Sequence, residues 1–516
     1  MQVQTPTLAL IVKRDWEIEQ FVSEPFWEVQ AKFNIEGKTY QGKWEKDGES
    51  RIHSKEMAEK IAAFCQKKPA KIADIQVEKK DYLPPLLYNL STLQADANRR
   101  YKFPPKKTLD VLQKLYQKGN VSYPRSDSRH VTKGEAEMFP ETLSKLGKIK
   151  EYEDLFPLPI QSIKDNKRYV NDQKVTDHYA IIPTEQVPNL EKLSSDEKII
   201  YDLIVKSLIA AHYEKSITEY TTIQTLVDGR ASFISKGKVL VEEGWKKVIK
   251  QQDKDKEPIL PLMNIGEEGK VSKVDVKESK TQPPKRYTEG QLITLMKTAG
   301  KYIEDKELEK VLMKTEGLGT EATRAGIITM LKDRNYITIT KNIVYPTAKA
   351  KILITAIGDE ILASPEMTAK WEQRLKEISE GKASPKQFMD QTNKMITHLI
   401  SITSKSSSEW VFTNVDQDDF VPGKQRKRKS VNLGKCIKCD GHMVDKGTFY
   451  GCTNYQKTKC DFTISKKIMG KSITQVNIKK LLSDGKTDVI NGFKKDDKVF
   501  NAKLILSEGR VKLSFD

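Results

Sequence analysis

The sequence predicts a multidomain α+β protein, in which a β-rich domain is interrupted by a helical domain and followed by further helical and β-rich segments. The chain has 516 residues. A single hydrophobic core stops growing near about 250–300 residues, so a chain of this length divides into domains. In addition, two regions with the alternating pattern of strands flank a region in which apolar residues recur every three or four positions.

The two parts of the β-rich domain are residues 21–84 and 216–285. Apolar and polar residues alternate on both sides of Glu36–Gly37, which predicts a β-hairpin, and Asp228–Gly229 mark a turn between two further strands. Because the two ends of a domain often lie close together, a second domain can be inserted between strands of the first. Residues 85–215 are therefore interpreted as an inserted helical domain.

A second helical domain is predicted over residues 286–402. It starts near Thr288, which forms the pattern of a capping box with Gln291. Further along, a helix over residues 321–334 leads into a hairpin whose turn is Lys341–Asn342. A helix followed by a hairpin resembles a winged-helix unit, which reads DNA in some proteins and only packs in others.

The last part of the chain is predicted to contain a linker, residues 403–434, then a zinc ribbon, residues 435–468, and a small β-rich segment, residues 469–516. The linker is rich in serine and in charges of both signs. Its basic run could bind phosphate or could be a solvated tether. The candidate phosphate-binding residues of this run are Lys424, Arg426, Lys427 and Arg428.

The zinc ribbon is predicted from four of the five cysteines. Cys436 and Cys439 form a C-x2-C knuckle, and Cys452 and Cys460 follow. Four thiolates in this spacing suit tetrahedral Zn2+ and leave no open position for water, so we expect a structural metal ion. The fifth cysteine, Cys65, lies in an apolar helical stretch and is interpreted as a small buried hydrophobe.

Aromatic and basic residues stand between the cysteines of the predicted ribbon. Phe449 and Tyr450, together with Lys438 and Lys446, could stack on single-stranded bases and hold their phosphates. In so small a domain, the aromatic side chains could instead form the core. Both interpretations stay open at this level.

The overall charge favours nucleic acid as a partner. Lysine and arginine number 89 against 71 acidic residues, a formal net charge of +18, and 37% of residues are hydrophobic, which suffices for folding. Cations that neutralise phosphates release condensed counterions and bind without sequence preference. The alternative is a surface made basic for solubility. No apolar run reaches the roughly 18 residues of a membrane span, so we expect a cytoplasmic, nucleoid-associated protein without a membrane partner.

A tyrosine and an arginine flank a proline in the inserted helical domain. Pro124 disfavours helix at Tyr123, so we expect an extended stretch from which Tyr123 and Arg125 project to the same side. The helix that follows can be capped by Thr132 and Glu135. On these residues alone, the pair is as typical of a loop as of a catalytic site.

Six sequence blocks change this interpretation. In chain order they are LPPLLYNLSTLQADANRRYKF, VSYPRSDSRHV, DHYAIIPTE, PPKRYTEGQLI, EGLGTEATRAGII and MTAKWEQRLKEISEGK. Their content and order resemble the type IA DNA topoisomerases, specifically the bacterial topoisomerase III branch. The resemblance covers roughly residues 1–400, and a zinc ribbon of the kind found in these enzymes follows.

The resemblance implies a toroidal fold. Its arch would be the β-rich domain, the inserted helical domain would bear the catalytic tyrosine, and residues 1–20 would be a remnant of the N-terminal part of the helical gate domain. It also implies a transesterification, in which Tyr123 attacks a phosphodiester of single-stranded DNA and holds the 5′-phosphate. Another strand then passes and the 3′-hydroxyl reverses the step. The covalent link would keep the bond energy, so no ATP is needed, and no phosphate-binding loop of the G-x-x-x-x-G-K-[ST] type occurs.

Further site residues follow from the same resemblance. Arg125 and His178 match residues beside the scissile phosphate, and an arginine there can stabilise the charge that develops on its oxygens. Tyr179 stands where the family often has a second histidine, and Glu321 stands where it usually has proline, a helix start that tolerates either residue. The residues that match a block near the DNA path are Gly317, Gly319, Thr320, Thr323 and Arg324.

The front of the chain departs from the family. Members have an arginine where this chain has Gln2, and ahead of it a TOPRIM domain whose acidic cluster holds Mg2+. We therefore expect a monomer whose Mg2+ site is supplied by a separate TOPRIM-containing polypeptide. The alternative is a paralogue that binds single-stranded DNA without cutting it. A relaxase-type tyrosine enzyme is disfavoured, because no histidine triad for a metal is apparent among six histidines.

Overall fold

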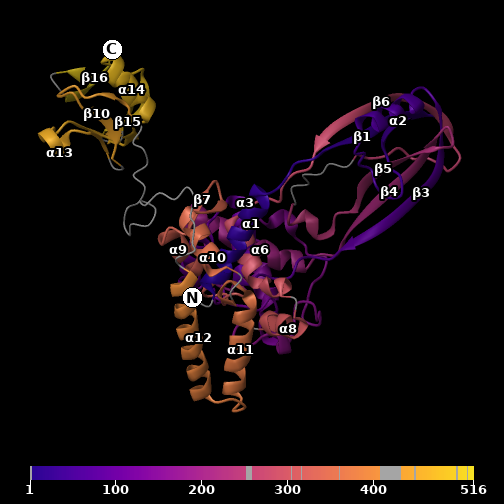
Figure 1. Ribbon diagram of the computed structural model, residues 1–516, viewed down its shortest axis with the longest axis horizontal. Helices are drawn as coiled ribbons and strands as arrows, with labels where there is room; N and C mark the ends of the chain where they lie inside the picture. The colour runs from indigo at the N-terminus through magenta and orange to yellow at the C-terminus, as the bar shows by residue number, and fades with distance from the viewer. Residues whose placement is uncertain are drawn as a thin grey trace. The chain divides into compact units, whose positions relative to one another are not determined.

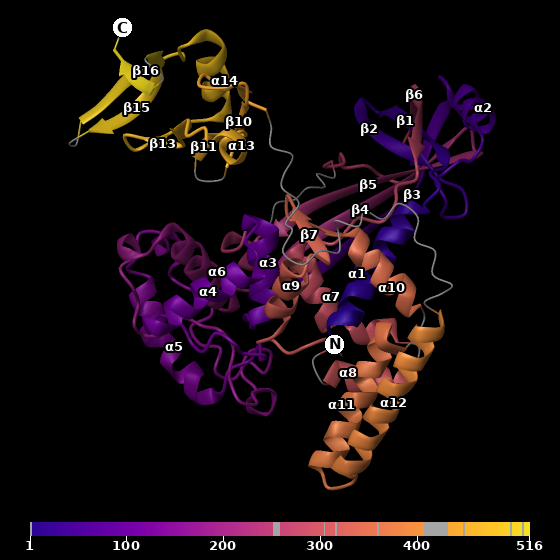
Figure 2. The ribbon, with the colours of Figure 1, turned by 60° about the vertical axis from the view of Figure 1, so that its left-hand side comes forward.

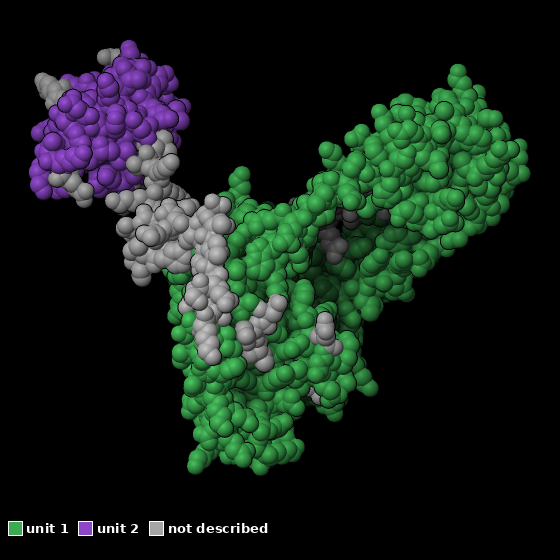
Figure 3. Space-filling view, viewed as in Figure 1, with its two compact units in different colours: residues 1–413 green, residues 414–516 purple. Residues whose placement is uncertain are grey.

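The structure is a computed structural model that describes residues 3–250, 258–303, 305–314, 317–358, 361–406, 432–446, 449–495, 498–507 and 510–515. The chain divides into two compact units, Met1–Thr413 and Asn414–Asp516 (Figure 3). None of the described helices is long and apolar enough to cross a lipid bilayer.

Six antiparallel strands of the first unit form a closed barrel (Figure 1). Their order around the barrel is β1-β2-β5-β4-β3-β6. Helix α2 (Lys55–Cys65) packs on β1 and β6. The strands are β1 (Pro25–Ile35), β2 (Lys38–Trp44), β3 (Pro69–Tyr82), β4 (Ser216–Val227), β5 (Ala231–Glu242) and β6 (Glu268–Lys280).

The predicted hairpins of the barrel are confirmed. β1 pairs with β2 across Glu36 and Gly37, whose φ angles are 48° and 80°. β4 pairs with β5 across a turn that contains Asp228 and Gly229, with φ angles of 52° and 66°. Two successive positive φ angles give a turn the twist that matches its strands, which explains why glycine takes the second position in both.

A helical region lies between β3 and β4 in the chain (Figure 2). Its α-helices are α3 (Leu90–Tyr101), α4 (Pro105–Gln117), α5 (Lys133–Leu146) and α6 (Ser195–Ala211). Short 3-10 helices accompany them at η1 (Glu153–Leu155), η2 (Asp172–Lys174) and η3 (Leu190–Lys192). A further one, η4 (Gly244–Lys247), follows β5 in the chain and packs on the same region through Trp245. One hydrophobic cluster, with Leu93, Leu112 and Ile204 fully buried, joins these elements. We call this region the tyrosine domain, because it contains Tyr123.

A second group of helices follows the barrel, and we call it the α7–α12 domain. Its helices are α7 (Glu289–Lys297), η5 (Ala299–Tyr302), α8 (Lys306–Lys314), α9 (Arg324–Asp333), α10 (Ala348–Ile357), η6 (Ile361–Ala363), α11 (Pro365–Ser379) and α12 (Pro385–Ser406). The last helix therefore continues beyond the predicted domain end at residue 402. The hairpin of β7 (Ile337–Thr340) and β8 (Ile343–Pro346) turns at Lys341–Asn342, as predicted.

The first helix of the chain, α1 (Gln4–Glu19), belongs to the same core as the α7–α12 domain. Leu8 and Val12 are buried in its hydrophobic cluster. The Asp15 carboxylate, 6% exposed, pairs with Arg286 Nε at 2.6 Å and with Lys351 Nζ at 2.7 Å. These contacts connect residues that are far apart in the sequence into one folded domain.

The second unit combines a four-stranded sheet with a three-stranded one. The first sheet has the order β12-β11-β10-β9 and the second has the order β15-β16-β17. A single hydrophobic cluster spans both, with Met443, Ile478 and Phe493 fully buried. The segment predicted as β-rich, residues 469–516, also contains a helix, α14. The elements are β9 (Gly434–Lys435), β10 (His442–Asp445), β11 (Phe449–Cys452), α13 (Tyr455–Thr458), β12 (Thr463–Ser465), β13 (Lys467–Ile468), β14 (Lys471–Ser472), α14 (Gln475–Asp484), β15 (Ile490–Lys495), β16 (Lys498–Ser507) and β17 (Arg510–Ser514).

Glu197 stabilises the start of α6 in the tyrosine domain. Its carboxylate accepts the Ser194 amide at 2.9 Å, closing a capping box, and the Lys118 ammonium lies 2.6 Å away. The hydrogen bond from Lys118, with those from Ser194, lowers the pKa of the Glu197 carboxyl from 4.5 to about 2. The charged form of this side chain therefore favours the folded state.

We expect Glu197→Gln to lower the free energy of unfolding by about 1–2 kcal/mol at neutral pH, because it weakens a cap and an ion pair. The contribution of Glu197 is complete above pH 4.5 and disappears as the pH falls toward about 2. Urea unfolding at about pH 7 and about pH 3 should show a smaller difference from wild type at the acid pH. Glu59→Gln, in an exposed pair with Lys55, is the control. Equal stability of the Glu197 variant and wild type at neutral pH would contradict the expectation.

Candidate active site and metal centre

The segment around Tyr123 is held against the segment around His178 by backbone pairing. The Ser122 amide donates to the Ile182 carbonyl at 3.0 Å, and its hydroxyl donates to the Ala180 carbonyl at 2.9 Å. The Ile182 amide donates back to the Ser122 hydroxyl at 2.9 Å. Because this pairing ends one residue before Tyr123 and begins two residues after His178, it brings the two side chains together.

Tyr123 lies between two aromatic rings. Its ring centroid is 4.0 Å from that of His178, with an interplanar angle of 33°, and 5.6 Å from that of Tyr116, which meets it edge-on at 87°. Tyr123 is half-buried, whereas Arg125 and His178 are exposed. The structure thus places the three predicted catalytic residues in one region, with the arginine and the histidine open to solvent.

The predicted extended stretch after Tyr123 is wrong. Pro124 and Arg125 form a turn. Proline favours an extended conformation for the residue before it, but its own fixed φ angle also suits the second position of a β-turn. The helix predicted to follow is present as α5, and the Thr132 amide donates to the Glu135 carboxylate at 3.1 Å, as the capping box requires.

Residues 122–129 around Tyr123 are called the tyrosine segment. The first turn of α3 holds the other end of this segment. The Leu90 amide donates to the Ser126 carbonyl at 3.1 Å, and the Asn89 side-chain amide donates to the Asp127 carbonyl at 2.8 Å. Arg129 donates to the carbonyls of the chain just before α3, at 2.9 and 3.0 Å. Sequence reasoning missed these residues, although the Asn89 position, directly before a helix, is typical of an N-cap.

The surroundings of the tyrosine segment disfavour extra positive charge. Burial lowers the pKa of His130, and the charges of Lys174, Arg129 and Arg168 lower it further, so that imidazole is neutral at pH 7. Burial raises the pKa of Tyr179, so this side chain is a protonated phenol there. Tyr179 therefore does not gain or lose a proton near neutral pH, as a histidine at this position would.

The two glycines before α9 are required by the backbone. Gly317 and Gly319 have φ angles of +76° and +77°. A Cβ at Gly317 would come within 2.3 Å of the Met296 carbonyl oxygen. The hydroxyl groups of the exposed Thr320 and Thr323 follow them on the surface, and the Thr320 amide donates to Thr323 Oγ1 at 2.9 Å. These two threonines are available to a ligand.

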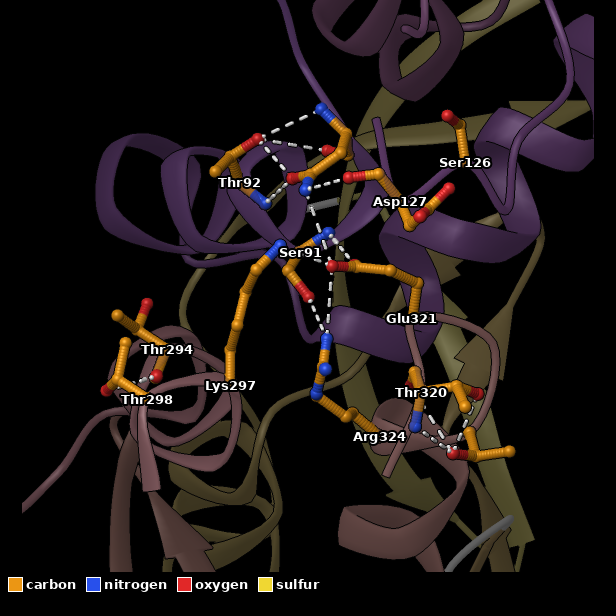
Figure 4. Close-up of polar contacts among 12 residues, drawn as sticks. Ser91, Thr92, Ser126, Asp127, Thr294, Lys297, Thr298, Thr320, Glu321 and Arg324 are labelled. Atoms are coloured by element: carbon orange, nitrogen blue, oxygen red, sulfur yellow. Dashed lines mark hydrogen bonds and ion pairs between the residues drawn. The ribbon is translucent and has the colours of Figure 1, made fainter. Parts of the chain in front are cut away.

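Arg324 and Glu321 are instead buried, at 0% and 2% exposure. The Glu321 carboxylate accepts the Ser91 amide at 2.6 Å and lies 2.6 Å from Lys297 Nζ and 3.1 Å from Arg324 Nη1 (Figure 4). A proline at position 321 would have no carboxylate for these three donors, so Glu321 has a role here that goes beyond a helix start. Position 321 precedes α9 and points into an interface between domains.

Some predicted residues lie outside the described part of the chain. These are the basic run of the linker, Lys424, Arg426, Lys427 and Arg428, and the departure at Gln2.

The four cysteines of the second unit converge on one point. All four Sγ atoms lie within 4.8 Å of one another. Cys436 Sγ and Cys460 Sγ are 3.7 Å apart, and Cys439 Sγ and Cys452 Sγ are 3.4 Å apart. A tetrahedral ion with Zn–S bonds of about 2.3 Å requires sulfur separations of about 3.8 Å. The sulfur positions therefore fit zinc.

The backbone around the cysteines also suits thiolates. The amides of Lys438, Gly441 and Asn454 point at sulfur atoms, with N to Sγ distances of 3.4, 3.4 and 3.3 Å. A Cβ at Gly441 would come within 2.7 Å of Cys452 Sγ, so the approach requires glycine. Four sulfur ligands leave no coordination position for substrate, so this metal would have a structural role.

The two aromatic residues of the ribbon serve different purposes. Tyr450 is 2% exposed and its hydroxyl donates to the Ile473 carbonyl at 2.9 Å, so it belongs to the core. Phe449 is 40% exposed. Only Phe449 of the two is available for stacking on a base.

Comparison with known proteins gives the family. The family model for DNA topoisomerase matches residues 2–390, and the model for the C-terminal repeat of topoisomerase matches residues 459–516. The chain belongs to the type IA DNA topoisomerase family. The family predicted from the six sequence blocks is thereby confirmed.

Relatives with two different names are similar to the chain. DNA topoisomerase 1 of Alkalihalophilus pseudofirmus is 38% identical over 100% of this chain and 71% of its own length. DNA topoisomerase 3 of Bacillus thuringiensis is 33% identical over 85% of this chain and 61% of its length. DNA topoisomerase 3 of Haemophilus influenzae is 35% identical over 77% of this chain and 64% of its length. The chain thus spans about two thirds of the length of these relatives, and the predicted topoisomerase III branch stays a prediction.

A solved structure supports the same fold. Full-length topoisomerase I from Thermotoga maritima matches 99% of this chain and 72% of its own, with a TM-score of 0.56 and 22% sequence identity. The likeness covers the mixed helix and strand architecture of the chain.

Removal of the metal should affect only the second unit. We expect purified protein to contain one zinc ion per chain, and Cys436→Ser to lose it and to unfold the second unit, because the cysteine cluster and both sheets share one hydrophobic cluster. Zinc content by a colorimetric chelator and circular dichroism of the two proteins would check this. Cys65→Ala, in helix α2 against the barrel, is the matched control and should keep its zinc. A Cys436→Ser protein that retained stoichiometric zinc would contradict the assignment.

Proposed function

We propose that this chain carries out the cleavage and rejoining chemistry of a type IA topoisomerase of the topoisomerase III kind on single-stranded DNA. The observation that supports this most directly is the contact of Tyr123 with His178, fixed by the pairing of Ser122 with Ala180 and Ile182. A half-buried phenol beside an exposed imidazole, with an exposed guanidinium two residues further along the chain, supplies the groups that a tyrosine nucleophile toward phosphate uses.

The proposed step exchanges one phosphodiester for another. The Tyr123 phenolic oxygen forms a bond to phosphorus, the bond from phosphorus to the 3′-oxygen breaks, and the phenolic proton is passed on while the 3′-oxygen gains one. Arg125 is exposed on the turn that follows and can donate to the phosphate oxygens as charge develops. Rejoining is the same exchange in reverse. Since one phosphodiester is kept throughout, the reaction needs no ATP.

Magnesium chemistry is not assigned to any residue of this chain. Within the described residues, the four cysteines form the only group of three or more His, Cys, Asp or Glu side chains that could hold a metal ion. The acidic Mg2+ site that the family resemblance implies therefore has no counterpart among them. We propose that a TOPRIM domain completes the site, and that the assembled enzyme acts as a monomer on DNA in the cytoplasm.

The covalent intermediate is the decisive test. We expect the chain, mixed with Mg2+, a TOPRIM fragment and an end-labelled single-stranded oligonucleotide, to form a protein–DNA adduct that resists denaturation. Tyr123→Phe should abolish it, at least about 1,000-fold, because no other oxygen replaces the nucleophile. Tyr101→Phe, an exposed tyrosine of the same domain, should leave it unchanged. DNA binding without any adduct in the wild-type mixture would favour a binding paralogue and overturn the proposal.

Binding itself should depend steeply on salt. With the net charge of +18, we expect the logarithm of the binding constant for single-stranded DNA to fall linearly with the logarithm of the salt concentration. Contact with about five phosphates would give a slope of about −3.5. Fluorescence anisotropy of a labelled oligonucleotide between about 50 and about 200 mM salt would measure it. A slope near zero would contradict a phosphate-binding surface.

A further inference from the structure

The tyrosine domain and the α7–α12 domain have separate hydrophobic clusters. Where α3 packs on α7, the buried side chains are polar instead. Asn89, Ser91, Asn98, Glu321 and Arg324 are all at most 3% exposed. A pocket of about 400 Å3 lies between α4 and α9 and is lined by residues of both domains, among them Lys107 and Thr329. Interfaces between domains that move are more polar than domain cores, so this surface has the composition of one that separates.

One contact lies at the N-terminal end of α3. The Ser91 amide donates to Glu321 Oε2 at 2.6 Å, and Arg324 Nη1 donates to the Ser91 hydroxyl at 2.8 Å. The Asn89 side chain reaches Glu321 Oε1 at 3.4 Å. Ser91 stands in the first turn of the helix, where an amide has no acceptor within the helix. Its acceptor is supplied from the other domain.

A second contact lies near the C-terminal end of the same helix. Asn98 Oδ1 accepts the Gly290 amide at 2.9 Å, and the side chains of Asn98 and Asn342 exchange hydrogen bonds of 2.6 and 3.0 Å. Gly290, in α7, lies so close that a Cβ there would be 2.8 Å from the Asn98 side chain. The approach of the two helices depends on this glycine.

The buried ion pairs at the N-terminal end of α3 lie on one side of the interface. Lys297 and Arg324, which pair with Glu321, stand in the same domain as Glu321. Among the contacts given above, separation of the domains would therefore keep the ion pairs of Glu321 and break hydrogen bonds to the neutral groups of Asn89, Ser91 and Asn98. Splitting a buried ion pair leaves an uncompensated charge and is far more costly. Directional hydrogen bonds across the interface therefore define one closed arrangement. The interface can open because opening does not split these ion pairs.

The tyrosine segment belongs to the moving side. Leu90 and Asn89, one and two positions before the amide that meets Glu321, hold Ser126 and Asp127 within the tyrosine domain. Opening would thus carry Tyr123 away together with α3 and leave its own support intact.

We propose that the two contacts at the ends of α3 form a latch that sets the closed position of the tyrosine domain, with Glu321 and Gly290 as positioning residues. The proposal rests on the proposed function, because strand passage is the step for which the domains must part. The latch keeps Tyr123 near the α7–α12 domain during cleavage and rejoining, and releases without splitting the ion pairs of Glu321 with Lys297 and Arg324.

Gly290→Ala tests the latch without weakening the domain that carries it. Alanine is the better helix former, and the added Cβ acts as a wedge against Asn98. We expect hydrogen exchange of the Ser91 amide, measured without DNA and resolved to single residues, to accelerate about tenfold or more. The Leu90 amide, bonded within the tyrosine domain, should keep its rate. Gly326→Ala is the matched control, because nothing lies within 4 Å of a Cβ there.

Glu321→Gln supplies a second variant, with Asp15→Asn as its control. Both carboxylates are buried and pair with two cations, but Asp15 lies within one domain. Glu321→Gln should accelerate exchange of the Ser91 amide, whereas Asp15→Asn should not.

Equal Ser91 exchange in Gly290→Ala and Gly326→Ala would overturn the latch. So would equal acceleration at Ser91 and Leu90, which would mean that α3 unfolds rather than separates. Because exchange is measured without DNA, failure of the covalent adduct assay leaves this result standing, so failure of the latch can be distinguished from failure of the proposed function.

Discussion

The first turn of an α-helix carries amide groups that find no acceptor within the helix. In α3 these groups are shared among three neighbours: Leu90 donates to the carbonyl of Ser126, Ser91 to the carboxylate of Glu321, and Thr92 to the side chain of Asn89. One turn of helix thereby fixes the segment that bears the tyrosine and meets the next domain. The position of the candidate active site therefore depends on the hydrogen bonds that the unpaired amide groups of this first helical turn must make.

Features that depend on neighbours in the sequence could be predicted. The turn at Lys341–Asn342, the capping box at Thr288 and the hairpin at Glu36–Gly37 each require only a few adjacent residues, and each is present. The spacing of the cysteines was equally informative, because their loops bring the sulfur atoms together without help from distant parts of the chain. The family resemblance extended this local information to Tyr123, although no spacing rule identifies that residue.

Features that depend on distant partners could not be predicted. Glu321 meets Ser91 across 230 positions, and Asn98 meets Asn342 across 244. A single sequence gives no sign of such pairs, so Glu321 was interpreted by its place near a helix start. The prediction of an extended stretch after Tyr123 is wrong for a different reason. Pro124 restricts the conformation of the residue before it, but both a strand and a turn remain possible after it.

The cysteine outside the four-cysteine cluster has a practical consequence. Cys65 is fully buried against the barrel, and burial, with the charge of Asp228, raises the pKa of its thiol to about 11. The thiolate is the reactive form of cysteine, so this residue is silent toward alkylating reagents at neutral pH. Modification of thiols in the folded chain would therefore report on the four clustered cysteines alone. With a chromogenic thiol reagent, the rate of modification would follow metal release from these cysteines without any substitution in the chain.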